Sequence, residues 1–578
     1  MRRITLVFSF FALLGGLVIF RLFWWQIIKG EKLAEEAKNQ RFTISSVLAS
    51  RGTIKTADDY SLATNKTNYL LFAEPARFST GSGFIAQKIA PLLSIEETDP
   101  AKRRRFFKQK ETDLKNKLAG KNLRWIPLEK GVSKEEKEKI EKENLAGLGF
   151  EKEEIRYYPE ASMAAHLLGF VGGSETGENR GYFGIEGFYD RQLQGVSGDF
   201  LEETDAFGRP IVFGEFNAEN PENGRDLVLF LNRRVQFIIE ENLKKGINDF
   251  GAKGGLAIVM DPETGGILAM ASFPNYDPQN WVSFPKDSFK NPSVADSFEP
   301  GSIFKPIVMA AALNEKAVTP GTKCPVCAGP RQIGDYWVRT FNNKYHPELT
   351  MTEVLENSDN TGMVFVGEKL GREKLYEYIN NFGFGSPTGI DLQEEQGGKV
   401  KEIKDWYPID SATVTFGQGI AVTPVQMVRA FAAIANGGKL LQPKVVKKII
   451  GKEREITIEP KIVRQIMKLE TSKVLTEMLV SVGLKSPLHF PLEKHPELRH
   501  YRIAAKSGTA QIPIAGHYDP KKTVGSVVGF APADEPKFVL LVVLWEPSAA
   551  PWGSDTAGPI FFNIMSELLL SEKIFPTR

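Results

Sequence analysis

The hydrophobic pattern opens with one long apolar run. Residues 4–20 carry no charge, and the bulky segment 22–25, which includes two tryptophans, extends the run beyond Arg21. This length suits a bilayer-spanning helix, and the tryptophans suit its interfacial end. A cleaved signal peptide is the alternative, but bulky residues follow the run where a small-residue cleavage site would belong. We therefore expect an uncleaved transmembrane anchor at residues 4–24.

Between the anchor and residue 250 the pattern mixes strands, turns and charged helices. Residues 41–62 alternate apolar and polar positions around a glycine turn, which predicts strands. Residues 101–154 are dense in charges of both signs at helical spacing. We interpret their basic run, residues 102–105, as part of a solvated helix face rather than a site for anionic lipid or polymer. Residues 25–250 contain no nucleophile constellation and are interpreted as a non-catalytic pedestal domain.

A second region begins at the glycine-rich residues 251–255. Strand-like runs follow at 256–260 and 267–271 with a turn between them, which predicts a hairpin. A helical run starts near residue 302. Further along, we expect a helix at 425–435 closed by an Asn-Gly-Gly C-cap, antiparallel strands at 524–530 and 538–544, and a last helix at 560–570. Residues 251–572 therefore form a domain that mixes sheet and helix around one core.

Composition narrows the functional classes. The chain has 578 residues, too many for one ordinary domain, and a hydrophobic content of 42% that can build a large core. A net charge of +2 gives no indication of nucleic-acid binding. The histidines show no metal-ligand spacing, and no glycine-rich phosphate loop is present. We expect neither a metal nor a cofactor.

The first candidate for chemistry is Ser302, which follows a Pro-Gly turn and begins an apolar, alanine-rich run. The first turn of a helix has unpaired N–H groups and a positive dipole end, which favour developing negative charge. Lys305 lies one turn later on the same face. A partly desolvated lysine amine can accept a serine proton, so the two residues form a candidate nucleophile pair. Taken alone, this spacing is common by chance.

Two further elements strengthen the candidate. One is Ser358-Asp359-Asn360, and the other is Lys506-Ser507-Gly508-Thr509. Ser-x-x-Lys, Ser-Asp-Asn and Lys-Thr-Gly in this chain order are the signature of penicillin-binding proteins and class A β-lactamases. Serine stands at 507 where the signature has threonine, but the hydroxyl is kept.

Taken as a whole, the chain resembles the class B penicillin-binding proteins, which are membrane-anchored D,D-transpeptidases of bacterial cell-wall synthesis. Within that family, residues 530–534 and 553–561 resemble the septal, or division, branch. An elongation-specific enzyme of the same class is the alternative. The resemblance also rests on Arg51-Gly-Thr-Ile54, Arg156-x-Tyr-Pro159, Gly181-x-x-Gly184-x-Glu186, Asp261-Pro-x-Thr-Gly265 and Gly417-Gln-Gly419.

The resemblance implies a fold and a topology. The fold would be a single N-terminal transmembrane helix, an elongated α+β pedestal, and a β-lactamase-like domain with a five-stranded antiparallel sheet flanked by helices. The chain would be a single-pass protein of the cytoplasmic membrane, with residues 1–3 in the cytoplasm and the catalytic domain outside. Implied partners are a polytopic SEDS-type glycosyltransferase and other divisome or elongasome proteins.

The resemblance also implies roles for the motif residues. Ser302 would attack the D-Ala-D-Ala end of a stem peptide, and β-lactams would acylate it in the same way. Lys305 would accept its proton, and Ser358 would relay a proton to the leaving amine. Asn360 would hydrogen-bond Lys305 and the substrate, while Lys506 would hold the network.

On the substrate-binding strand, the resemblance gives roles to Ser507, Gly508 and Thr509. The two hydroxyls would take the terminal carboxylate. The backbone N–H groups of Ser302 and Thr509 would form the oxyanion hole.

Cys324 and Cys327 are the only cysteines. Their spacing allows a small disulfide, a redox pair or half a zinc site. In the oxidising compartment that the resemblance implies, a local disulfide or idle thiols are favoured.

Three other functions share some of these features. A serine β-lactamase has the three motifs but not usually an anchor and a long preceding domain, and we find no clear deacylating glutamate element. A D,D-carboxypeptidase uses the same acyl-enzyme with water as acceptor. A non-catalytic β-lactam sensor would need cytoplasmic signalling sequence, and only residues 1–3 precede the expected anchor. A divisome scaffold would support growth without Ser302.

Overall fold

The computed structural model describes residues 2–93, 99–119, 123–173, 179–203, 216–341, 343–514 and 517–576. The chain divides into two compact units. The first comprises Met1–Gly52 and Gln194–Gly224, and the second comprises Thr53–Leu193 and Arg225–Arg578. The catalytic motifs all lie in the second unit.

The first unit contains the predicted apolar helix. Helix α1 (Arg2–Phe23) continues through a π-helical turn at Trp24–Ile28, and the whole helix has 27 residues, including an 18-residue window with a mean hydropathy of 2.3. It is long and apolar enough to cross a membrane. After it come helix α2 (Gly30–Arg41) and an antiparallel sheet of order β1-β8-β9, with strands at Phe42–Val47, Gly198–Glu203 and Phe216–Ala218.

The second unit contains a seven-stranded sheet that joins distant parts of the sequence. Its order is β19-β18-β10-β2-β3-β4, with β5 also paired to β3. Strand β10 is parallel to β2 and antiparallel to β18. The strands are β2 (Ile54–Lys55), β3 (Ser61–Ala73), β4 (Ile126–Val132), β5 (Leu148–Tyr157), β10 (Asp226–Leu229), β18 (Val446–Ile450) and β19 (Glu455–Thr457). The sheet thus combines strands from the predicted pedestal with two strands from the predicted catalytic domain.

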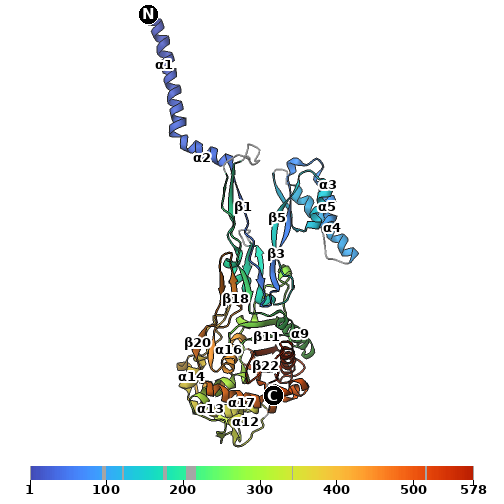
Figure 1. The fold of residues 1–578 in the computed structure, drawn as a ribbon, viewed down its shortest axis with the longest axis vertical. Helices are drawn as coiled ribbons and strands as arrows, with labels where there is room; N and C mark the ends of the chain where they lie inside the picture. The colour runs from blue at the N-terminus through green and yellow to red at the C-terminus, as the bar shows by residue number, and fades with distance from the viewer. Residues whose placement is uncertain are drawn as a thin grey trace. The chain divides into compact units, whose positions relative to one another are not determined.

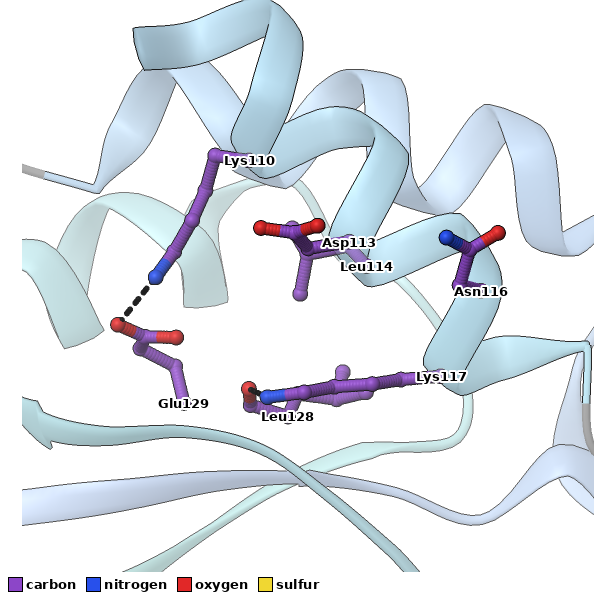
Figure 2. A pocket seen from close by; sticks show the side chains of 7 residues that line it. All are labelled: Lys110, Asp113, Leu114, Asn116, Lys117, Leu128 and Glu129. Atoms are coloured by element: carbon purple, nitrogen blue, oxygen red, sulfur yellow. Dashed lines mark hydrogen bonds and ion pairs between the residues drawn. The ribbon is translucent and has the colours of Figure 1, made fainter.

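Helices α3 (Ser82–Ile89), α4 (Pro100–Leu118) and α5 (Lys134–Lys142) lie beside β3 and β5 (Figure 1). They share a separate small core that includes Leu71, Ile85, Leu114, Leu128 and Ile140. A cavity of about 300 Å³ lies between α4 and β4. Among its lining residues, drawn in Figure 2, Lys110 pairs with Glu129 at 2.6 Å and Lys117 donates to the Leu128 carbonyl. The charge-dense stretch 101–154 thus forms two helices, α4 and α5, whose charged side chains are mostly exposed, but it also contains strand β4 and most of β5.

The five-stranded antiparallel sheet predicted for the catalytic domain is present, in the order β12-β11-β23-β22-β21. Alternate residues of β23 enter two different cores because successive strand side chains point to opposite faces. Leu540 and Val542 pack with helices α9 and α19, whereas Leu541 and Val543 pack with α16. The strands are β11 (Gly254–Met260), β12 (Ile267–Phe273), β21 (Ala504–Ile514), β22 (His517–Ala531) and β23 (Phe538–Trp545).

Helix α9 (Arg233–Phe250) precedes residue 251 but packs on this sheet and on α19 (Ala557–Ser571). The Asn232 side chain caps its first turn by accepting from the N–H groups of Arg234 and Val235. The predicted pedestal range therefore contains one helix of the catalytic fold.

The remaining elements complete the second unit. The pedestal range also contains α6 (Ala165–Leu168), β6 (Phe170–Gly173), β7 (Asn179–Tyr182), α7 (Gly184–Phe188) and α8 (Asp190–Gln194), and the last residue of α8 belongs to the first unit. The catalytic part adds α10 (Pro292–Ala295), α11 (Lys305–Asn314), β13 (Lys323–Cys324), β14 (Arg331–Ile333), β15 (Tyr336–Val338), β16 (Leu349–Thr350), α12 (Met351–Glu356), α13 (Asn360–Leu370), α14 (Arg372–Asn381), α15 (Pro408–Val414), α16 (Pro424–Ala435), β17 (Lys439–Leu441), β20 (Ile462–Gln465), α17 (Leu469–Lys485) and α18 (His489–Glu493).

Candidate active site

Ser302 and Lys305 lie where the sequence predicts them, at the start of a helix. Gly301–Phe304 forms a 3-10 turn that runs directly into α11. Ser302 is half-buried, and Lys305 is fully buried. Gly301 has a φ of +53°, and a Cβ there would lie 2.8 Å from the carbonyl oxygen of Thr509. Only glycine meets both demands, so this residue lets the nucleophile turn pack closely against strand β21.

Ser358 and Asn360 lie in a tight turn between helices α12 and α13. Ser358 has a φ of +51°, in the left-handed region that side chains other than glycine seldom adopt. Asp359 is the N-cap of α13, and its carboxylate accepts from the Gly362 N–H at 2.8 Å. Such a conformation persists where the surrounding structure enforces it, and it is frequent at functional sites.

Hydrogen bonds unite the three motifs. The Lys305 Nζ donates to the Ser358 carbonyl at 2.5 Å, to Asn360 Oδ1 at 2.8 Å and to Ser358 Oγ at 3.2 Å. The Lys506 Nζ donates to the same Ser358 Oγ at 3.1 Å and to the Ser507 carbonyl at 2.8 Å. The Ser358 hydroxyl therefore bridges two lysines, one from each flanking motif.

The two lysines are held in an environment that favours their neutral forms. Burial lowers the pKa of Lys305 well below its usual value, the charge of Lys506 lowers it further, and Asp359 opposes both effects. Burial alone lowers the pKa of Lys506 to about 7. A neutral amine has two N–H groups and one lone pair. Neutral Lys305 can thus donate to the Ser358 carbonyl and to Asn360 while keeping a lone pair for a proton.

Strand β21 is the edge strand of its sheet and carries the third motif. Lys506 is buried, whereas Ser507 and Thr509 are partly exposed. Thr509 Oγ1 accepts from the Gly553 N–H at 2.9 Å. A Cβ on Gly508 would lie 3.0 Å from Ile303 and 3.1 Å from the Pro300 carbonyl, so glycine permits the strand to approach the nucleophile turn. All eight predicted site residues therefore lie in this one region.

The structure adds contacts that the sequence did not indicate. The Asn360 side-chain amide donates to the Arg339 carbonyl at 3.0 Å. Phe341 and Trp552 are partly exposed and form an edge-to-face pair with ring centroids 5.2 Å apart. These contacts join segments far apart in sequence. No local pattern marks them, and the carbonyl contact does not depend on which side chain residue 339 carries.

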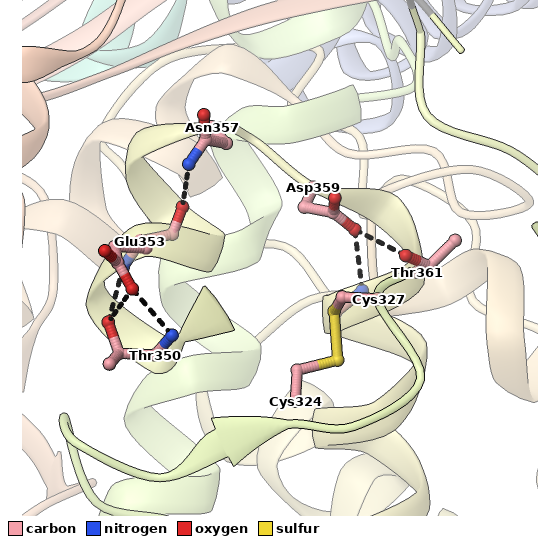
Figure 3. Close-up of a disulfide and its surroundings, with 8 residues drawn as sticks. Cys324, Cys327, Thr350, Glu353, Asn357, Asp359 and Thr361 are labelled. Carbon is pink, nitrogen blue, oxygen red and sulfur yellow. Dashed lines mark hydrogen bonds between the residues drawn. A yellow bond between two sulfur atoms is a disulfide. The ribbon is translucent and has the colours of Figure 1, made fainter. Parts of the chain in front are cut away.

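The structure shows the state of the two cysteines. Cys324 and Cys327 form a disulfide, and both residues are fully buried (Figure 3). Of the alternatives left open by the sequence, the local disulfide is confirmed.

Two sequence families match this chain. Residues 255–566 match the penicillin-binding protein transpeptidase domain, and residues 46–229 match the penicillin-binding protein dimerisation domain. Stage V sporulation protein D of Bacillus subtilis is 33% identical over 579 residues, which cover 98% of this chain and 86% of that protein. Peptidoglycan D,D-transpeptidase FtsI of Escherichia coli K12 is 28% identical over 580 residues, which cover 98% of this chain and 92% of that protein.

A solved structure shows the same architecture. The crystal structure of a peptidoglycan synthetase from Bifidobacterium adolescentis superposes with a TM-score of 0.72 at 25% sequence identity, covering 93% of this chain and 98% of that one. The clustering of the three motifs, the two matched families and this likeness all indicate the same family. The chain belongs to the class B penicillin-binding proteins, the serine D,D-transpeptidases of peptidoglycan synthesis, and its likeness to FtsI fits their septal branch.

Proposed function

We propose that Ser302 is the nucleophile with which this chain cross-links stem peptides ending in D-Ala-D-Ala. The observation that supports this role best is the hydrogen-bond network in which the half-buried Ser358 hydroxyl joins two buried lysines, Lys305 and Lys506. Lys305 lies one helical turn after Ser302. A serine hydroxyl needs a nearby base, and a lysine with a lowered pKa is such a base at neutral pH.

In the proposed acylation, Ser302 Oγ attacks the carbonyl carbon of the penultimate D-alanine. Its proton passes to the lone pair of Lys305, and the new oxyanion is held by the backbone N–H groups of Ser302 and Thr509. The bond to the terminal D-alanine then breaks, and a proton reaches the leaving amine through the Ser358 hydroxyl. D-Alanine departs as the free amino acid, leaving an ester on Ser302.

In the proposed second step, the amine of another stem peptide attacks this ester and regenerates Ser302. A β-lactam enters the first step in the same way, but its ring-opened amine stays attached to the acyl group. The hydroxyls of Ser507 and Thr509 take the substrate carboxylate, beside the backbone of Gly508. Asn360 positions Lys305 and binds the substrate amide, while Lys506 supplies positive potential.

The proposed organisation follows the order of the chain. Residues 1–3 are cytoplasmic, 4–24 span the cytoplasmic membrane, 25–250 form the pedestal and 251–572 form the transpeptidase domain outside. The apolar helix Arg2–Ile28 supports the anchor. We propose a polytopic SEDS-type glycosyltransferase and other division proteins as partners, because a cross-linking enzyme needs a polymerised glycan. Proteins of the elongation machinery are the alternative partners.

The experiment is intact-protein mass spectrometry of the full-length chain in detergent with benzylpenicillin. We expect a persistent adduct on the wild type and on Ser79→Ala, an exposed serine far from the motifs in sequence, and none on Ser302→Ala. No adduct on the wild type would overturn the proposal. Rapid loss of the adduct with drug hydrolysis would indicate a β-lactamase instead. Release of D-alanine without cross-linking, when an amine acceptor is supplied, would indicate a carboxypeptidase.

A further inference from the structure

The disulfide lies directly beside the turn that carries Ser358 and Asn360. Figure 3 shows it next to Asp359, the residue between them. A Cβ placed on Gly362, in the first turn of α13, would lie 3.2 Å from the Cys327 sulfur and 2.6 Å from Val354 of α12. The sulfur therefore packs against the helix that begins at the turn, close to the helix that ends there.

The other half of the disulfide reaches the turn through a β-ribbon. Cys324 on β13 pairs with Leu349 on β16, and the adjacent residue Thr350 is the N-cap of α12. Thr350 and Glu353 form a capping box, with the Glu353 carboxylate accepting from the Thr350 N–H at 2.8 Å. Helix α12 then runs for less than two turns before the Ser358 turn. The disulfide is thus connected to the helices on both sides of the turn.

The segment between Cys327 and β16 also supports the site. It leaves from the disulfide, forms the β14–β15 hairpin and returns to pair with Cys324. On the way, the Arg339 carbonyl accepts the Asn360 side chain at 3.0 Å, and the hairpin residue Arg331 pairs with Glu368 of α13 at 2.6 Å. The disulfide therefore lies where this segment begins and where it returns, and the segment holds the Asn360 side chain in place.

We propose that the Cys324–Cys327 disulfide is a positioning element that holds Ser358 and Asn360 against Lys305. This inference rests on the proposed function. Ser358 keeps a left-handed backbone conformation that its neighbours must enforce. The disulfide closes a loop of four residues, so it removes little chain entropy and contributes little to global stability through that route. Its effect is instead local, on the rigidity of the turn.

The test measures single-turnover acylation of the full-length chain in detergent by a fluorescent penicillin, between about pH 6 and pH 10. Three forms are compared: the oxidised wild type, the wild type reduced with a phosphine, and C324S/C327S. Because the chain has only two cysteines, the reductant has one disulfide to act on. The double variant controls for other effects of the reductant, since its rate should not respond to it. Maleimide labelling and intact mass verify the reduction.

We expect the reduced wild type and the double variant to be acylated about tenfold more slowly near neutral pH. Their rates should recover as the pH rises, because a loosened turn admits water and lets the pKa of Lys305 return toward its usual value. Simple loss of folded protein would lower the amplitude of acylation and leave the rate constant of the folded fraction unchanged. Unchanged rate constants, or rate constants lowered by one factor at every pH, would overturn the inference.

Chemical reduction and the C324S/C327S substitution are independent ways to break the disulfide, so either one can test the inference if the other fails. If C324S/C327S does not fold, the reduced wild type decides, and if the buried disulfide resists the reductant, the double variant decides. An oxidised wild type that is not acylated at all would contradict the proposed function rather than the role of the disulfide.

Discussion

Two buried clusters of ionisable side chains in this chain differ in the signs of the charges that they bring together. In the pedestal range, Arg156 and Glu186 are almost fully buried, and the Arg156 Nε lies 2.6 Å from Glu186 Oε1. In the catalytic region, Lys305 and Lys506 are equally buried but carry the same sign, and a neutral hydroxyl, that of Ser358, lies between them. One cluster joins opposite charges, and the other places two bases side by side.

The difference shows how burial serves two purposes. A buried ion pair with good geometry keeps both groups charged, and its main value is to fix the position of the segments that carry them. Buried like charges instead favour the neutral form, so a proton binds weakly and moves easily. Glu186, interpreted from the sequence as part of the scaffold, therefore fits a structural role, whereas Lys305 fits a reactive one.

The largest effect should come from removing Lys305, the proposed general base. Lys305→Met should slow penicillin acylation by about 10²–10⁴-fold, because general-base assistance is lost. The fold should persist, since a buried amine is replaced by an apolar side chain of similar length. A stopped-flow acylation assay and a thermal melt measure both effects, with Lys115→Met on the exposed face of α4 as control. An acylation rate within twofold of the wild type would show that Lys305 is not the base.

Breaking the ion pair of Arg156 and Glu186 should change the stability of the protein rather than its acylation rate. Glu186→Leu leaves the Arg156 charge buried without its ion-pair partner, which should lower the free energy of unfolding by about 3–5 kcal/mol. The acylation rate per folded molecule should stay the same. Denaturant unfolding measures the first quantity, and active-site titration with penicillin the second. The double variant R156M/E186L should regain most of the stability, and if it does not, the ion pair is not the reason for the loss.

The like-charge cluster should make stability depend on pH. The folded-state pKa of Lys506 is about 7, against 10.5 for a free lysine, so between these values the unfolded chain binds more protons. Stability should therefore rise with pH in this window, by up to about 1.4 kcal/mol per pH unit from this group. Lys506→Met should remove that contribution. Unfolding of both proteins at about pH 7 and pH 9 tests this, and identical slopes would refute it.

The smallest change in stability should come from breaking an ion pair that is exposed to solvent. Lys115 and Glu111 are one helical turn apart on α4, with their charged atoms 2.6 Å apart and their side chains 47% and 29% exposed. Glu111→Gln should change the free energy of unfolding by only about 0.3–0.5 kcal/mol, and less in high salt, because water screens the pair. A loss comparable to that of Glu186→Leu would mean that burial does not separate the clusters.

Local chemistry made much of the site predictable. Helix geometry places Ser302 and Lys305 on one face, and the three motifs together indicated which side chains meet. The hairpin of β11 and β12 followed from two short apolar runs with a turn between them. The positive φ of Ser358 and the contact of Asn360 with the Arg339 carbonyl could not be predicted, because both depend on packing between segments distant in sequence.

The seven-stranded sheet shows the same limit at the level of the fold. Alternation in a strand indicates which face is buried, but it does not indicate which strand will be its neighbour. Nothing in the sequence of β18 pointed to β10, more than two hundred positions earlier, yet the two strands pair from Asp226 to Leu229. The partner of Glu186 was hidden in the same way, since Arg156 lies thirty positions away.

The pairing of β10 with β18 has a consequence for how such proteins can evolve. A crossover between two related genes at the codon for residue 251 would combine a β10 from one parent with a β18 from the other. Mismatched strands would leave backbone groups unpaired at a sheet edge, which favours aggregation. Recombination that transfers Asp226–Leu229 together with Val446–Ile450 keeps two strands that already pair with each other. Functional chimaeras should therefore inherit both segments from one ancestor.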